Sequence, residues 1–158
     1  MTRDLETIII RPATTRDLSS IVEIYQESFS RRQGPATFSR DLKEIMLNSP
    51  YSMLYFVAEA DNKIRGFISA YPLGDVMDIY DLTVRLEDRR QGIGRQLMER
   101  ILLESKARDI DLLMLEVAES NLPALKLYEK LGFICYGLRE KYYQDTGEDA
   151  YLMRLDLI

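Results

Sequence analysis

The sequence predicts an α/β fold in which strands and helices alternate along one domain. Short apolar runs of strand length are separated by longer segments whose apolar residues recur every three or four positions, the spacing of one helix face. At 158 residues the chain can bury about 70% of the surface that its unfolded form exposes. It contains no internal repeat, low-complexity stretch or linker, so we expect a single domain over residues 1–158.

The N-terminal third is expected to form a strand followed by two helices. The strand-like run IIIRP begins at Ile8, and Thr14 followed by Asp17 has the pattern of a helix N-cap with an acidic partner. Apolar residues then recur at helical spacing. After the connection Ser30–Ser39, a second short helix must end before Pro50, because the residue that precedes a proline avoids the helical region.

The remaining segments continue the alternation. MLYFVAEA and IRGFISAY flank the polar turn Asp61–Lys63, which indicates an antiparallel hairpin. VMDIYDLTV predicts a further strand, Gly92 opens a helix, and LLMLEV is short and apolar enough for a central strand. Asn121 is suited to cap the next helix, whose first turn tolerates Pro123. FICYGLREKYY and DAYLMRLDL predict two final strands joined by Gln144–Glu148.

The charge balance argues against a protein that wraps nucleic acid. The chain carries 21 basic and 26 acidic side chains, for a net charge of −5. The basic residues are nevertheless concentrated in RRQGIGRQLMER, which contains Arg89, Arg90, Arg95 and Arg100. Such a patch on an acidic protein suits a small polyanion better than a long duplex.

The absence of histidine excludes the usual nucleophile couples. No Ser/His or Cys/His pair can form, and a single cysteine, Cys135, rules out zinc sites of the finger type. We therefore expect no metal, and a general base must be a carboxylate, a tyrosine, a lysine or a water. Nothing near Cys135 in the sequence activates it, so we interpret it as a packing residue.

The chain is expected to be a cytoplasmic protein without membrane contact, either a monomer or a weak homodimer. No apolar run approaches the roughly 20 residues of a membrane span. The start, MTRDLETIII, lacks the apolar region of a signal peptide, and a lone cysteine fits a reducing compartment.

The segment Arg89-Arg90-Gln91-Gly92-Ile93-Gly94, between a predicted strand and a predicted helix, has the features of a phosphate cradle. Glycines let backbone N–H groups approach an oxygen-rich group, and the following helix N-terminus carries partial positive charge. The residues alone leave a solvated basic loop open as well. A dinucleotide fold is disfavoured, because Leu97 occupies the third glycine position and RLEDR separates the strand from the glycines.

Longer segments carry a family resemblance that spans nearly the whole chain. From IIIRPATTRDL to EDAYLMRLDL it resembles the GNAT superfamily of acetyl-coenzyme-A-dependent N-acetyltransferases. LEVAESNLPALKLYEKLGF and REKYYQDTGEDAYLM look most like the RimI-type and archaeal protein N-terminal (ribosomal-protein-alanine) acetyltransferases. The resemblance implies acetyl-CoA as cosubstrate and a mixed, mostly antiparallel sheet of six or seven strands, splayed at its centre and flanked by about four helices.

The resemblance also assigns cofactor residues by position. It implies that the pantetheine arm is lined by Leu82, Thr83 and Val84, with the N–H of Val84 polarising the thioester carbonyl in an oxyanion-hole role. Asn121 matches a position that contacts the cofactor, which is compatible with its role as a helix cap. The pyrophosphate is expected in the cradle, formed by Arg89, Arg90, Gln91, Gly92, Ile93, Gly94 and Arg95.

Glu116 and Tyr128 match the base and the acid of the RimI-type pattern, in a direct transfer without an acyl-enzyme. Transfer requires an uncharged amine, and an α-amino group with a pKa of about 7.7 to 8.0 is mostly protonated at neutral pH. We expect the apolar strand to raise the pKa of Glu116 toward the working range, and Tyr128 to protonate the departing thiolate. The residues alone also allow Glu116 to be a strand-end carboxylate paired with Lys or Arg, and Tyr128 to be a core aromatic. Tyr80, acting through water, ranks second as base.

The resemblance points to a protein or peptide N-terminus as acceptor, with ribosomal proteins among the candidates. Tyr142 and Tyr143 match a tyrosine pair that hydrogen-bonds the acceptor backbone, although the residues alone favour an aromatic pair at a strand end. The loop Ser28–Phe38, with Phe29, is expected to form the other wall of the acceptor groove. This loop lacks the Leu-Pro-Glu-Asn-Tyr type segment of relatives, and Ala118 stands where arginine is common, which leaves the preferred first residue open.

Two alternative functions are a small free amine or lysine side chain as acceptor, and a non-catalytic acyl-CoA-binding module on the same fold.

Overall fold

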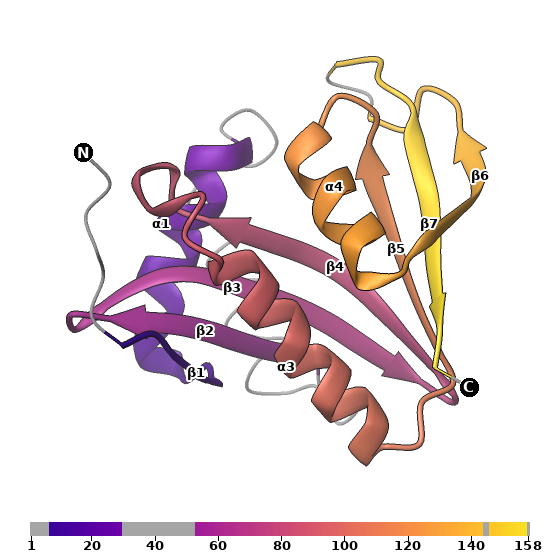
Figure 1. Cartoon of the computed structure of the whole chain (residues 1–158). Coiled ribbons are helices and arrows are strands. Elements are labelled where there is room, and N and C mark those ends of the chain that lie inside the picture. The colour runs from indigo at the N-terminus through magenta and orange to yellow at the C-terminus, as the bar shows by residue number, and fades with distance from the viewer. Residues whose placement is uncertain (1–6, 30–52, 144–145, 158) are drawn as a thin grey trace. The chain divides into compact units, whose positions relative to one another are not determined.

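The computed structural model describes residues 7–29, 53–143 and 146–157, which form an α/β structure with a mixed sheet (Figure 1). Within these residues the sheet has seven strands in the order β1-β2-β3-β4-β5-β7-β6. β4 and β5 are parallel, whereas β1–β2, β2–β3, β5–β7 and β6–β7 are antiparallel. No helix in the described ranges is long and apolar enough to cross a membrane.

The strands are β1 (Ile9–Pro12), β2 (Leu54–Ala60), β3 (Lys63–Leu73), β4 (Val76–Val84), β5 (Leu112–Ala118), β6 (Ile134–Arg139) and β7 (Ala150–Asp156). The described helices are α1 (Leu18–Phe29), α3 (Ile93–Ala107) and α4 (Leu122–Leu131), with two short 3-10 turns, η1 (Thr15–Asp17) and η2 (Leu86–Asp88).

The chain divides into two compact units. The first consists of Met1–Ala70 and Asp81–Leu102, and the second of Tyr71–Tyr80 and Leu103–Ile158. The chain therefore passes from one unit to the other after Ala70, after Tyr80 and after Leu102. The expectation of a single domain stays a prediction.

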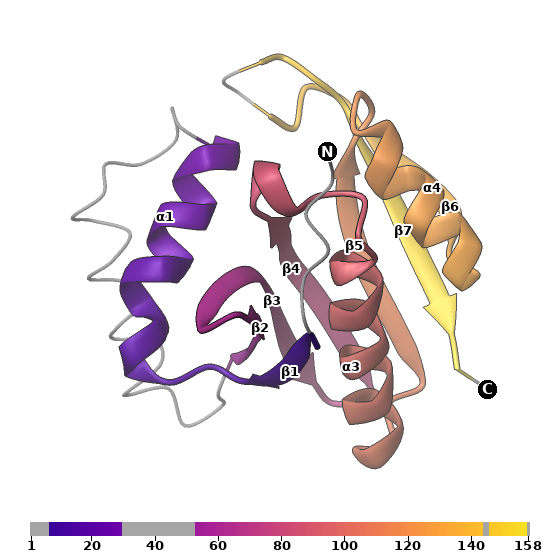
Figure 2. The ribbon, with the colours of Figure 1, turned by 60° about the vertical axis from the view of Figure 1, so that its left-hand side comes forward.

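In the first unit, α1 lies on one face of the sheet formed by β1, β2 and β3, and α3 lies on the opposite face (Figures 1 and 2). Because successive strand residues point to opposite faces, Val57 contacts α1 while its neighbour Phe56 faces away from it. The guanidinium of Arg100 on α3 lies 4.7 Å from the ring centroid of Phe56. The buried cluster under α1 consists of Ile21, Val22, Ile24, Val57, Ile64 and Phe67.

The predicted helix cap is present at the start of α1. The backbone N–H of Thr14 donates to Asp17 Oδ2 at 2.8 Å, and η1 leads directly into α1. Asp17 is buried and also accepts two hydrogen bonds from Arg11, at 2.8 and 3.0 Å. Arg11 in turn donates to Glu59 at 2.9 Å. One guanidinium therefore links β1, β2 and the start of the helix.

β2 and β3 are joined by the predicted tight turn. Asp61 and Asn62 adopt φ values of 51° and 59°, the left-handed region that two-residue hairpins require. Farther along β3, Gly66 lies close to β4. A Cβ atom at Gly66 would be 2.9 Å from the carbonyl oxygen of Thr83 and 3.3 Å from the Cα of Val84. A side chain at this position would therefore push β3 and β4 apart.

In the second unit, α4 covers the buried face of β5 and β7. Figures 1 and 2 both show α4 beside these strands. Gly132 ends the helix with φ 99°, and a Cβ atom there would be 3.3 Å from Leu155 of β7. Leu155 pairs with Leu113, which lies on the buried face of β5. The residues of that face are Leu113, Leu115 and Val117, whereas Glu116 between them is half-buried.

The last part of the predicted β6 strand and the second predicted helix are not among the described elements. β6 ends at Arg139 rather than continuing through the KYY segment. The strand ends here because Lys141 adopts φ 48° and its N–H donates, across a loop, to the side chain of Asp149 at 2.8 Å. The second short helix, predicted before Pro50, lies outside the described residues.

Candidate active site

The phosphate cradle lies in the first unit, between η2 and the first turn of α3. Arg90 and Gly92 both adopt positive φ values, 65° and 78°, so the chain makes two left-handed steps immediately before the helix begins at Ile93. Such turns point successive backbone N–H groups into one concavity. The first turn of α3 contains no acidic residue, and its N–H groups have no acceptors within the helix.

The space beside Gly92 is open. A Cβ atom at Gly92 would meet nothing within 4 Å. Arg90 and Arg95 are exposed, and Arg95 forms an ion pair with Glu99 at 3.1 Å. Gln91 and Gly94 are half-buried, whereas Ile93 is buried and anchors the start of α3. Positive φ values, arginines and a helix N-terminus together match the chemistry of a pyrophosphate.

The side chain of Arg89 contacts β4 and α1. Its Nε donates to the carbonyl oxygen of Val84 and its Nη2 to the hydroxyl of Ser28, both at 3.3 Å. Its expected role as a phosphate ligand stays a prediction, and these contacts join the end of β4 to the end of α1.

The strand expected to line the pantetheine arm ends directly before the cradle. Leu82 and Val84 are half-buried, whereas Thr83 is buried. The hydroxyl of Thr83 has no hydrogen-bond partner among the described residues. The N–H of Arg85, the first residue after β4, donates to the carbonyl oxygen of Arg65 at 2.8 Å, which fixes β4 to β3 beside Val84.

Glu116, in the second unit, is not buried in an apolar environment as the sequence suggested. It lies on the half-exposed face of β5, and 29% of its side chain is accessible. Its Oε1 forms an ion pair with Arg139 of β6 at 3.2 Å. The arrangement is the strand-end carboxylate paired with an arginine that the residues alone allowed. A role as base requires this ion pair to open when the acceptor binds.

Two groups near Glu116 were missed by sequence analysis. Asp78 lies on β4 opposite Met114, two residues before Glu116 on the paired strand. Partial burial raises the pKa of Asp78, the charge of Glu116 raises it further, and Arg139 partly counteracts both. A signal was available, because Asp78 interrupts an apolar strand and alternation places it on the same face as Tyr80. Arg139 gave no such signal, since its approach depends on how β6 pairs with β7.

Tyr80 belongs to this same group. It is exposed, and the ladder between β4 and β5 covers Val76–Ile79 and Leu112–Leu115, so it includes neither Tyr80 nor Glu116. Partial burial raises the pKa of Tyr80, and the charges of Asp78, Tyr71 and Glu116 raise it further. The structure thus brings the two candidate bases, Glu116 and Tyr80, into electrostatic contact.

Tyr128 comes from α4, on the other side of the strand from the Glu116 side chain. It is 7% exposed, and its ring lies 5.7 Å from that of Phe133 in a tilted arrangement. Its body is therefore a core aromatic, and the role of its hydroxyl as acid stays a prediction. Asn121 caps α4 as expected, since its side chain accepts from the N–H of Ala124 at 3.4 Å.

The candidate acceptor residues are only partly described. Tyr142 and Tyr143 form an edge-to-face pair with ring centroids 5.1 Å apart, and 43% of Tyr142 is exposed. Arg139 lies 5.7 Å from the ring of Tyr142. Phe29 is the last residue of α1, and both its side chain and the loop after it lie outside the described residues.

One unit of this mixed-sheet protein thus carries a helix N-terminus with arginines, which suits a phosphate-bearing ligand, and the other carries a carboxylate–phenol group on neighbouring strands. The Acetyltransferase (GNAT) family matches residues 18–133. The chain therefore belongs to the GNAT acetyltransferases and is an acetyl-CoA-dependent N-acetyltransferase.

Individual relatives support this assignment. The [ribosomal protein bS18]-alanine N-acetyltransferase of Escherichia coli is 32% identical over 145 residues, covering 90% of this chain and 93% of the relative. The N-alpha-acetyltransferase of Saccharolobus solfataricus is 33% identical over 160 residues, covering 91% and 90%. The crystal structure of the E. coli enzyme superposes with a TM-score of 0.82 at 29% identity, covering 96% of this chain and 94% of that one. The predicted family and the GNAT fold are confirmed.

Proposed function

We propose that this enzyme transfers the acetyl group of acetyl-CoA to the N-terminal α-amino group of a protein, by direct attack in a ternary complex. The observation that carries the proposal is the position of Arg139, which pairs with Glu116 at 3.2 Å and lies 5.7 Å from the ring of Tyr142. A candidate base and a candidate peptide-binding tyrosine therefore share one partner. The relatives named for N-terminal acetylation align over about nine-tenths of the chain.

The residues have distinct roles in this proposal. Acetyl-CoA supplies an acetyl group activated as a thioester. Glu116 accepts the proton of the α-ammonium group, directly or with Tyr80 through water, so that the neutral amine can attack. The N–H of Val84 stabilises the developing oxyanion, and the hydroxyl of Tyr128 returns a proton to the thiolate. The acceptor backbone is held by Tyr142 and Tyr143.

The first acceptor to test is the N-terminus of ribosomal protein bS18, because the E. coli relative is named for the alanine of that protein. A mixed peptide library tests the wider proposal. Its members vary the first residue, carry internal lysines and include N-terminally blocked controls, and mass spectrometry locates the acetyl group after incubation with acetyl-CoA. Acetylation confined to free α-amines is expected. Acetylation of blocked peptides at lysine, or of small amines alone, would contradict the proposal and the role given to Tyr142 and Tyr143.

A further inference from the structure

The 3-10 turn η2 is the only segment between the end of β4 and the cradle, apart from its flanking arginines, and it is anchored at both ends by buried groups. Its first residues follow Arg85, and its last residue, Asp88, directly precedes Arg89. Arg65, Arg85 and Asp88 are each 3% exposed. Burying a charged side chain costs free energy unless the charge is paired and hydrogen-bonded, so the partners of these three side chains indicate what they do.

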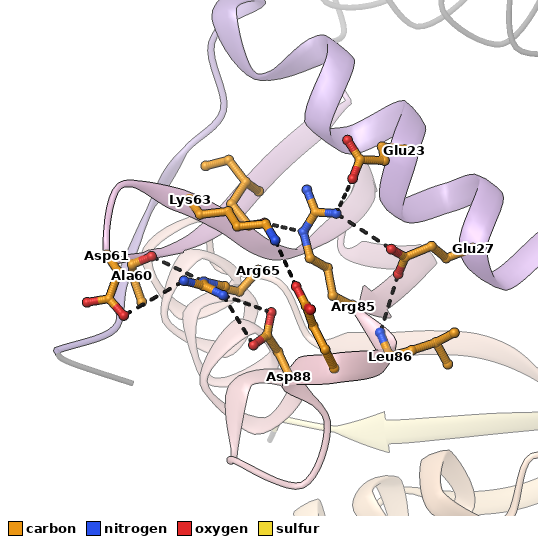
Figure 3. Close-up of polar contacts among 11 residues, drawn as sticks. Glu23, Glu27, Ala60, Asp61, Lys63, Arg65, Arg85, Leu86 and Asp88 are labelled. Atoms are coloured by element: carbon orange, nitrogen blue, oxygen red, sulfur yellow. Dashed lines mark hydrogen bonds and ion pairs between the residues drawn. The ribbon is translucent and has the colours of Figure 1, made fainter. Parts of the chain in front are cut away.

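The end of η2 is held by Arg65 of β3 (Figure 3). Arg65 Nη1 donates to both carboxylate oxygens of Asp88, at 3.3 and 3.4 Å. Its Nε donates to the carbonyl oxygen of Ala60 at 3.1 Å, and its Nη2 lies 3.8 Å from Asp61. Asp88 is therefore fixed to the β2–β3 hairpin by a planar guanidinium with several donors engaged.

The start of η2 is held by Arg85 and by α1. Arg85 Nε donates to the carbonyl oxygen of Ile64 at 2.7 Å, and its Nη1 contacts Glu23 at 2.6 Å and Glu27 at 3.6 Å. Glu27 also accepts a hydrogen bond from the N–H of Leu86 at 3.3 Å (Figure 3). One carboxylate thus contacts both the arginine before η2 and the first residue of η2.

Neighbouring carboxylates compensate the charges of these two arginines. Each guanidinium faces two carboxylates, Asp61 and Asp88 for Arg65, and Glu23 and Glu27 for Arg85. These carboxylates therefore cancel most of the electrostatic attraction that the two guanidinium groups would exert on a phosphate in the cradle. A buried ion pair also contributes little stability compared with apolar residues of the same volume. What such a pair does supply is a fixed orientation of the atoms that it joins.

We infer that Arg65, Asp88, Arg85 and Glu27 are positioning residues that hold η2 and thereby set the orientation of the phosphate cradle. The inference rests on the proposed placement of the acetyl-CoA pyrophosphate at Arg89–Arg95. It predicts that these residues govern the affinity contributed by the phosphates and not the affinity contributed by the acetyl-pantetheine arm.

The test compares two donors in the absence of any acceptor. Equilibrium binding of acetyl-CoA is measured by titration calorimetry, and binding of S-acetylpantetheine, which lacks the pyrophosphate, is measured by displacement. Two variants are used, Asp88→Asn and the double variant Arg65→Met with Asp88→Leu, which removes both charges of the buried pair together, although the carbonyl oxygen of Ala60 also loses its donor from Arg65. The matched control is Glu87→Gln, which removes the exposed Lys63–Glu87 ion pair, 2.7 Å long, on the same turn.

We expect both η2 variants to lose about 10- to 100-fold in affinity for acetyl-CoA, because a displacement of about 1 Å is enough to misalign such contacts. Affinity for S-acetylpantetheine should not change, and Glu87→Gln should match the wild type with both ligands. Thermal unfolding of each variant without ligand checks that it is folded at the temperature of the binding measurements. For the double variant the loss should also be independent of ionic strength, since the two removed charges compensate each other.

Equal weakening of both ligands would overturn the inference in favour of a general structural role, and unchanged acetyl-CoA binding would overturn it outright. A wild-type enzyme that binds the two ligands equally well would instead remove the cradle assignment on which the inference rests. Acceptor identity does not enter any of these measurements.

Discussion

At the scale of single residues, the arrangement around Arg139 determines what the candidate base must do. The ion pair with Arg139, 3.2 Å long, occupies the carboxylate of Glu116 that the proposal needs as a base. An acceptor ammonium group carries the same charge as the guanidinium and can replace it beside Glu116. In this proposal, the guanidinium of Arg139 therefore occupies, in the free enzyme, the position beside Glu116 that the ammonium group of the acceptor takes when it binds.

The proposed acid–base pair makes a direct kinetic prediction. Glu116→Gln and Tyr128→Phe should each lower kcat by about 10²- to 10⁴-fold, the usual contribution of a positioned acid or base, with little change in the thermal midpoint. Tyr80→Phe should have a smaller effect. Steady-state kinetics on the preferred peptide provide the measurement, and Glu119→Gln, an exposed carboxylate just beyond β5, is the control. Full turnover by both Glu116→Gln and Tyr128→Phe would refute the pair.

Asp78 makes a prediction about pH. Because folding raises the pKa of Asp78, its contribution to stability is greatest below its ordinary value of about 3.9 and is lost as the pH rises through the raised value. Asp78→Asn should therefore gain stability relative to the wild type as the pH rises from 3 to 7. It should also lower the pKa of Tyr80, which the charge of Asp78 raises. Urea unfolding across this pH range measures the first effect, and a pH-independent difference would contradict it.

At the scale of elements, the junction of β1 with α1 depends on one buried carboxylate. Asp17 closes the capping box with Thr14 and receives both terminal nitrogens of Arg11. Hydrogen bonds from Arg11 are the largest cause that lowers the pKa of Asp17, so its stabilising contribution is present above its ordinary value and is lost as the pH falls through the lowered one.

We therefore expect Asp17→Asn to destabilise the protein by about 1–3 kcal/mol near pH 7, because the charge-assisted bonds to Arg11 are lost while Asn keeps the shape. The difference from the wild type should shrink in acid, the opposite sign to Asp78→Asn. Urea unfolding at several pH values measures it. An equal difference at pH 7 and at pH 2 would show that the carboxylate charge is not responsible.

The approach of β3 to β4 gives a second prediction at this scale. Gly66→Ala should destabilise the protein by about 1–3 kcal/mol, since the added Cβ meets the backbone of Thr83 at 2.9 Å and backbone cannot move cheaply. Gly137→Ala is the matched control, because its Cβ would meet only the side chain of Leu152, at 3.2 Å, and that side chain can rotate. Thermal unfolding measures the stability of the two variants. An equal loss of stability in Gly66→Ala and Gly137→Ala would contradict the prediction.

The elements were largely predictable because their signals are local. The hairpin turn at Asp61–Asn62, the strand Val76–Val84 and the cap at Asn121 all follow from turn chemistry and periodicity. The end of β6 was not, because it depends on a contact between Lys141 and Asp149 across a loop. The cradle could be predicted from the local sequence Arg89–Arg95. The ion pairs Arg139–Glu116 and Arg65–Asp88 could not, because each joins residues 23 positions apart, a separation that no local sequence pattern indicates.

At the scale of the whole molecule, cosubstrate binding should stabilise the fold through the cradle. Acetyl-CoA at 100 times its Kd should add about 2.7 kcal/mol, which for a chain of this size raises Tm by about 5–10 °C. Gly92→Ala should reduce this rise because the cradle needs φ 78° at that position. Gly74→Ala, at φ 62° in the β3–β4 turn and equally open, carries a similar backbone cost and should leave the rise intact. Differential scanning fluorimetry with and without acetyl-CoA measures both, and an equal reduction in the two variants would contradict the assignment.

Because the chain passes three times between its two compact units, neither unit can be completed early during synthesis. The first unit cannot be completed before Leu102 has been made, and it encloses a stretch, Tyr71–Tyr80, that belongs to the second. Within that stretch Val76–Ile79 must await Leu112–Leu115, their parallel partners. A nascent chain therefore carries an unpaired strand edge while about thirty further residues are added, and parallel pairing of this kind forms slowly. Neither unit corresponds to a continuous fragment, so a truncated chain cannot yield either one alone.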